Sequence, residues 1–94
     1  MVKFPPWVDA PGLSDQARAA NRLRYLIGRT AVEVTKDGTF GAFADFCGID
    51  RGTLHVWIRR GSVSAPMALA IERAVGADVL RAVDLTDPLS IPVA

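Results

Sequence analysis

Residues 40–60 read FGAFADFCGIDRGTLHVWIRR, and this stretch decides how the chain is expected to fold. It predicts two short helices joined by a tight turn, a helix-turn-helix. Ala44 is the small residue needed where the two helices come closest, and Gly48 can adopt the positive φ that the turn requires. Ile49 then supplies an apolar side chain that plugs the turn from inside.

Both helices of this pair return apolar side chains to one core. Leu54, Trp57 and Ile58 recur at three- and four-residue steps, which places them on one face of the second helix. The first helix contributes three apolar residues, Phe40, Phe43 and Cys47. Cys47 is interpreted here as a small buried hydrophobe. The alternative interpretation of the whole stretch is a helical hairpin packed in an ordinary bundle.

Cap residues set the bounds expected for the pair. Thr39 is a suitable N-cap for a helix over about residues 40–47, which Gly48 would end. Asp50 is a suitable N-cap for the second helix, which is expected to run to about residue 60 before Gly61 stops it.

A longer amphipathic helix is predicted before this pair, over about residues 14–35. Ser14 is a good N-cap, and Asp15 lies favourably near the N-terminal end of the helix dipole. The apolar face is formed at three- and four-residue steps by Ala17, Ala20, Leu23, Ile27, Ala31 and Val34. The charged residues expected mostly on another face are Arg18, Arg22, Arg29 and Glu33.

Two further helices are predicted after the pair. Ser64 is expected to cap a fourth helix that contains Pro66 in its first turn and ends at Gly76. The core face expected for this helix is Met67, Ala70, Ile71, Ala74 and Val75. Asp78 is expected to cap a short fifth helix through about residue 83.

Prolines mark both ends of the chain as non-helical. Residues 1–13 hold three prolines and are expected to form an extended N-terminal arm, and residues 85–94 hold two more and are expected to form an extended tail. Residues 14–84 would form a single helix-turn-helix domain. The fold class predicted is therefore all-α, a compact bundle of four to five helices.

Charge is small in total but unevenly distributed. The formal net charge is +1, yet residues 1–61 carry nine Lys and Arg against six Asp and Glu. A local basic excess serves phosphate binding better than bulk charge does.

A single cysteine excludes an intrachain disulfide and fits a reducing compartment. With no signal peptide and no apolar run of about 18 residues, a soluble cytoplasmic protein that does not contact a membrane is expected.

The second helix of the pair presents a face that the core does not use. In helices that read DNA, residues near the N-terminus approach base edges in the major groove. The base contacts predicted on this helix are Arg51, Gly52, His55 and Val56. Arg51 suits a bidentate contact to guanine, Val56 suits a thymine methyl, and Gly52 lets the backbone come close. The alternatives are an Arg51 that is simply solvated and a His55 that packs against the fourth helix.

Phosphate contacts are predicted around the same helix, at Thr39, Thr53, Arg59 and Arg60. Thr39 precedes a helix N-terminus, where free N–H groups can receive a phosphate. Arg59 and Arg60 lie at the far end of the second helix, where contacts position the protein rather than specify a sequence. The alternative is that these two arginines only stabilise the helix end through its dipole.

These residues resemble the Cro-type phage repressor fold and its YdaS-like antitoxin relatives, over about residues 39–87. The marks are residues 43–49 (FADFCGI), residues 54–61 (LHVWIRRG) and residues 70–74 (AIERA), followed by residues 79–81 (VLR). The resemblance implies a lambda-repressor-like fold and a homodimer that binds a palindromic operator as a repressor. Carried over by position, Arg51, Gly52, His55 and Val56 would face the bases.

The function predicted is therefore a sequence-specific transcriptional regulator of phage or mobile-element type, acting as a homodimer on double-stranded DNA. The alternative is an antitoxin or adaptor that binds a partner protein through residues 85–94, where the apolar residues are Leu85, Leu89, Ile91 and Val93. An enzyme is not expected. One His and one Cys do not supply the four ligands of a usual zinc site, and no glycine-rich phosphate loop is present, so no metal or cofactor is predicted.

Overall fold

The computed structural model describes residues 2–93, and α1 (Asp15–Val34) is its longest element. Ser14 caps this helix as expected, because its hydroxyl oxygen accepts the N–H of Ala17. The face of α1 turned to the core carries Leu23, Leu26 and Ile27, none of them more than 2% exposed. The long first helix predicted from the sequence is therefore confirmed.

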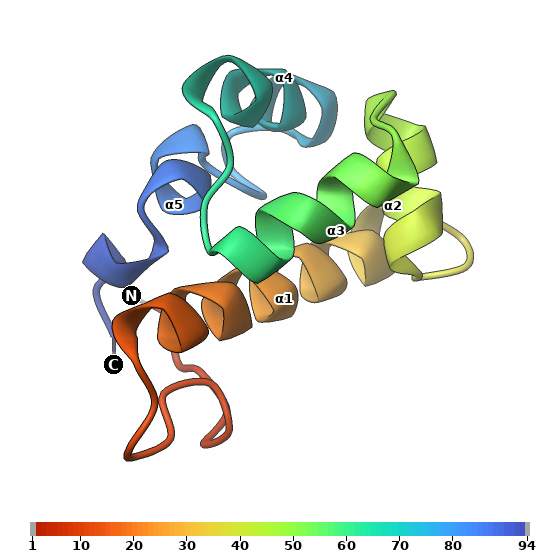
Figure 1. Cartoon of the computed structure of the whole chain (residues 1–94). Helices are drawn as coiled ribbons and strands as arrows, with labels where there is room; N and C mark the ends of the chain where they lie inside the picture. The colour runs from red at the N-terminus through yellow and green to blue at the C-terminus, as the bar shows by residue number, and fades with distance from the viewer. Residues whose placement is uncertain (1, 94) are drawn as a thin grey trace.

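α2 (Phe40–Cys47) and α3 (Arg51–Arg60) follow as the predicted pair, joined by a three-residue turn, and Figure 1 shows α3 lying along α1. The Thr39 hydroxyl accepts the N–H of Ala42, and an Asp50 carboxylate oxygen accepts the N–H of Thr53. Gly48 adopts φ 70°, the left-handed conformation that the turn requires. Both predicted caps and the predicted turn are confirmed.

α4 (Ala65–Val75), α5 (Ala82–Thr86) and a 3-10 turn, η1 (Pro88–Ser90), complete the bundle. In Figure 1, α4 and α5 lie on the side of α3 away from α1, while η1 comes back towards the start of α1. The fold of the described residues is an all-α bundle, as the sequence predicts. Within residues 2–93 no helix is both long and apolar enough to span a bilayer.

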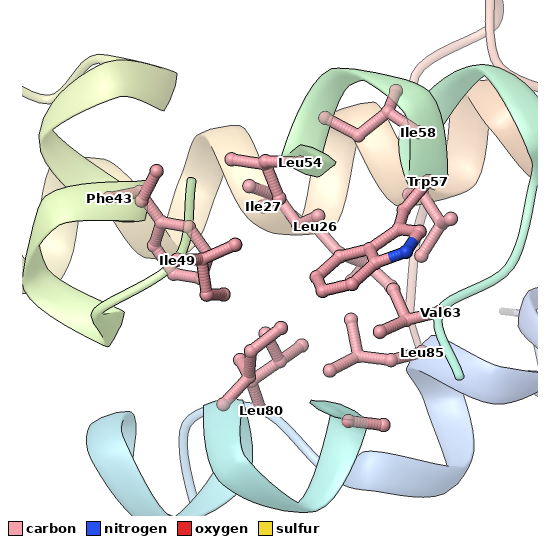
Figure 2. Packing of buried hydrophobic residues seen from close by; sticks show 14 of the residues in the cluster. Leu26, Ile27, Phe43, Ile49, Leu54, Trp57, Ile58, Val63, Leu80 and Leu85 are labelled. Carbon is pink, nitrogen blue, oxygen red and sulfur yellow. The ribbon is translucent and has the colours of Figure 1, made fainter. Parts of the chain in front are cut away.

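One apolar core joins these elements. Figure 2 shows the indole ring of Trp57 directed from α3 towards Val63 and Leu85, with Phe43 and Ile49 at the other end of the cluster. Phe43 is fully buried and Trp57 is 8% exposed. Apolar burial of this kind contributes about 25 cal/mol per Å², so Phe43 and Trp57 anchor α2 and α3 to the rest of the protein.

The fifth helix differs from its prediction, because it begins at Ala82 rather than after Asp78. Residues 77–79 form a turn instead, and Leu80 is buried between that turn and α5. The free N–H of Ala82 is satisfied by the Glu72 carboxylate of α4, at 2.9 Å. A side chain from another helix therefore replaces the local cap that the sequence suggested.

The expected face of α4 is also partly wrong. Ala68 and Ile71 are buried, whereas Ala70 and Ala74 are exposed. The buried side of α4 therefore differs from the predicted side. Alanine occurs both in the core and at the surface, so the spacing of alanines does not indicate which side of the helix is buried.

The expected extended tail is wrong in its conformation. Residues 85–93 contain the end of α5 and η1, and three of their side chains, Leu85, Pro88 and Ile91, are buried. Residue 94 lies outside the described residues. The segment ends beside the other terminus, where Val2 pairs with Val93 in a single parallel bridge. Burial of Leu85 and Ile91 explains the difference, because both side chains belong to the apolar core that also contains Trp57 and Leu23.

The N-terminal arm is likewise part of the body. Residues 2–13 contain no helix, as their prolines predict, but the side chain of Val8 is completely buried. Its N–H is bonded to Pro5, which makes a turn rather than a fully extended strand. Residue 1 lies outside the described residues.

Arg22 contacts segments at both ends of the chain, and it is buried rather than lying on a separate charged face of α1 as the sequence predicts. Its side chain is only 4% exposed and makes a two-pronged contact with Asp9, at 3.1 and 2.8 Å. The same guanidinium donates to the carbonyl oxygens of Pro88 and Ile91 and lies over the ring of Phe4. Burial is possible because these partners satisfy the charge and its N–H groups.

Candidate nucleic-acid interface

The outer face of α3 is separated cleanly from its packed face. Leu54, Trp57 and Ile58 are buried, and they fix the helix in the core. Every other residue of the helix is exposed, namely Arg51, Gly52, Thr53, His55, Val56, Arg59 and Arg60. All seven predicted contact residues of α3 therefore lie at the surface, on a helix whose orientation the core determines.

Arg51 does not extend away from α3 but folds back onto α2. Its Nε and Nη2 atoms donate to the two carboxylate oxygens of Asp45, at 3.3 and 2.6 Å. Gly41 makes room for the guanidinium, because a Cβ atom at that position would come within 2.9 Å of Nη1. In the free protein, Arg51 is therefore ion-paired rather than simply solvated.

The pair between Arg51 and Asp45 is exposed yet electrostatically well matched. The hydrogen bond from Arg51 lowers the pKa of Asp45 below its ordinary value, and the same bond raises the pKa of Arg51. Both groups therefore remain charged at neutral pH. Asp45 was not identified from the sequence, because a six-residue spacing across a turn belongs to no helical pairing rule.

The two threonines predicted at phosphates are placed differently. The hydroxyl of Thr53 donates to Asp50, at 3.3 Å, beside a carboxylate that would repel a phosphate. Thr39 is exposed, and its oxygen accepts from the backbone, which leaves its own O–H proton to donate outward. Thr39 thus suits a phosphate contact better than Thr53 does.

His55 and Val56 occupy the middle of the outer face. The ring of His55 meets that of Phe40 edge to face, with centroids 6.1 Å apart. This contact joins α3 to the start of α2 and orients the imidazole at the surface. Val56 leaves 46% of its surface exposed, which is consistent with an apolar contact to a partner.

Arg59 and Arg60 form a basic end to α3 beside the first turn of α1. The backbone carbonyl of Arg59 accepts a long bond from Gln16, at 3.5 Å. Arg60 lines an open depression of about 400 Å³ that also includes Asp15 and Asp87. By helix geometry, the nine residue steps from Arg51 to Arg60 place the two ends of α3 roughly 14 Å apart along the helix axis.

The described residues offer few groups for metal binding or for thiol chemistry. No group of three His, Cys, Asp or Glu side chains is gathered between residues 2 and 93. Cys47 is partly buried, and desolvation raises the pKa of its thiol to about 11. The thiol is therefore protonated at neutral pH, as the interpretation of this residue as a small hydrophobe implies.

Comparison with known protein families, curated proteins and solved structures gives no match to this chain.

Proposed function

We propose that this protein binds double-stranded DNA through α3 and regulates transcription. The observation that carries the proposal is the division of α3 into one face fixed by the core and one face left to solvent, with hydrogen-bond donors at both ends. A major groove admits a helix presented in this way.

The surrounding residues support phosphate contacts at both ends of the helix. Thr39 and the start of α2 lie at one end, and Arg59 and Arg60 lie at the other. Contacts of this kind would fix the register of α3 on the duplex. His55, Val56 and an Arg51 side chain no longer paired with Asp45 would then face the base edges.

A Cro-like repressor is the form of regulator proposed, on the resemblance noted for residues 39–87. Such a protein acts as a homodimer, with two copies of α3 about one turn of DNA, roughly 34 Å, apart. Its operator would be a short inverted repeat.

Selection of bound duplexes from a random pool tests the proposal. The wild type is expected to enrich an inverted repeat, and Arg51→Ala is expected to change the preference at one base pair of each half-site. Arg73→Ala, which removes an exposed arginine of α4, serves as the matched control and is expected to leave the enriched sequence unchanged. Failure to retain any duplex at low salt would refute DNA binding by this protein.

The adaptor alternative is not favoured by the contacts of residues 85–93. Two of its four apolar residues, Leu85 and Ile91, are already covered by the core. Deleting this segment would expose the core and confuse loss of folding with loss of a partner. Paired substitutions at Leu89 and Val93 therefore test the alternative better than a deletion, because these two side chains are at least partly accessible.

A further inference from the structure

In the exposed pair between Asp45 and Arg51, the Asp45 carboxylate competes with DNA for the Arg51 guanidinium. A guanidinium recognises guanine or phosphate through a pair of parallel N–H groups. In the free protein, the Nε and Nη2 pair of Arg51 is already occupied by the carboxylate of Asp45. Any bidentate partner of that edge must displace Asp45 first.

The local packing makes this competition specific to Arg51. Its guanidinium lies so close to α2 that a side chain at position 41 would collide with it. Gly41 therefore permits the folded-back position, and Asp45, one helical turn further along α2, holds it. The two arginines at the other end of α3, Arg59 and Arg60, are exposed and take part in none of the ion pairs found in residues 2–93.

We propose that Asp45 is a positioning residue that sets the sequence specificity of α3 by withholding Arg51 from DNA phosphates. A single phosphate, met at any position on DNA, gains little by displacing a matched carboxylate and also faces its negative charge. A correctly placed guanine accepts both N–H groups through O6 and N7, and it carries no negative charge that the displaced carboxylate would repel. This inference rests on the proposed function, because it assigns the selectivity of the same face.

Asp45→Asn tests the inference, because it keeps the shape of the side chain and removes its charge. Binding is measured on a random-sequence duplex and on the duplex enriched by selection, over a series of salt concentrations. With Arg51 released, the random duplex is expected to bind about three- to tenfold more tightly at low salt. The salt dependence is expected to steepen by roughly 0.9 for each bound subunit, the increment for one added phosphate contact. The ratio of specific to random affinity is expected to fall.

Two further variants separate positioning from a general change in charge. Asp37→Asn removes another exposed carboxylate, just before α2, and is expected to leave the salt slope unchanged. In the double variant Asp45→Asn/Arg51→Ala, the steeper slope is expected to disappear, because no guanidinium is left to release. The Nε–H resonance of Arg51 reports the pair directly and is expected to move in Asp45→Asn without DNA.

The outcomes distinguish the inference from the proposed function. If the wild type binds duplexes and Asp45→Asn has the same slope and specificity ratio, the inference is wrong and DNA binding stands. If neither protein retains DNA at low salt, both are wrong. If only Asp45→Asn binds, the proposed function is wrong for the wild type, and a role of Asp45 in its sequence specificity is wrong with it.

Discussion

Gly48 and Gly61 differ in how closely the backbone around them packs against α1, and alanine substitutions at the two positions test this difference. Both end a helix, and both adopt the left-handed conformation, with φ 70° and 85°. Their surroundings differ, because a Cβ atom at Gly48 meets nothing within 4 Å, whereas one at Gly61 would lie 2.9 Å from the Cβ of Ala19. It would also lie 3.3 Å from the backbone oxygen of Gln16.

The free energy of unfolding is expected to fall by different amounts in the two alanine variants. Left-handed backbone costs a residue with a side chain about 1–2 kcal/mol, and Gly48→Ala is expected to lose only this. Gly61→Ala is expected to lose the same amount and a further 1–3 kcal/mol, the usual cost of overpacking, because the backbone of α1 cannot move aside without disturbing its core face.

Urea unfolding followed by circular dichroism measures both losses. Adding Ala19→Gly to Gly61→Ala removes the nearest atom and is expected to recover part of the extra loss, although glycine itself costs about 1 kcal/mol inside a helix. Equal losses for the two single variants would refute the close packing of Gly61 against α1.

Three other perturbations follow from the buried and half-buried groups. Arg22→Met is expected to reduce the free energy of unfolding by about 3 kcal/mol, and urea unfolding measures the loss. The substitution removes the buried donor to the carbonyl oxygens of Pro88 and Ile91 and leaves Asp9 only its longer contact with Arg18. The pKa of Asp9 is lowered chiefly by its hydrogen bond from Arg22. The stability that the charged Asp9 carboxylate gives the folded state is therefore complete above its unfolded pKa of about 3.9 and is lost as pH falls through the lower folded value. The stability difference between wild type and Asp9→Asn is expected to shrink below about pH 4. A stability difference that stays constant as the pH is lowered through this range would contradict this assignment. Cys47, with its pKa raised to about 11, is expected to react with iodoacetamide at pH 8 roughly a hundred times more slowly in the folded protein than in urea, and equal rates would argue against its burial.

Local signals predicted the helix pair well. Thr39, Gly48 and Asp50 each act within three residues of their own position, so their roles can be inferred without knowing the fold. The spacing of Leu54, Trp57 and Ile58 likewise determines which side of α3 is buried. These residues explain why the bounds of α2 and α3 agree with the prediction.

Contacts between distant segments account for the wrong predictions. Glu72 satisfies the start of α5 from ten residues away, and nothing near Ala82 indicates it. Arginine is usually found at the surface, and only the partners of Arg22 in the N-terminal arm and at η1 make its burial possible. The candidate site shows the same limit, since the exposed face of α3 follows from periodicity but the pairing of Arg51 with Asp45 requires the turn between them.

The contacts of Arg22 also bear on how long the folded state persists. It bonds to Asp9 across 13 positions, but to Pro88 and Ile91 across 66 and 69. Contacts of such large sequence separation carry a high loop-closure cost and are expected to form after the folding transition state, in which nearer contacts between α1 and α3 are already present. Arg22→Met is therefore expected to leave the folding rate nearly unchanged and to accelerate unfolding by roughly a hundredfold, as stopped-flow kinetics would show. Arg22 would then act chiefly as a kinetic barrier to release of the two chain ends.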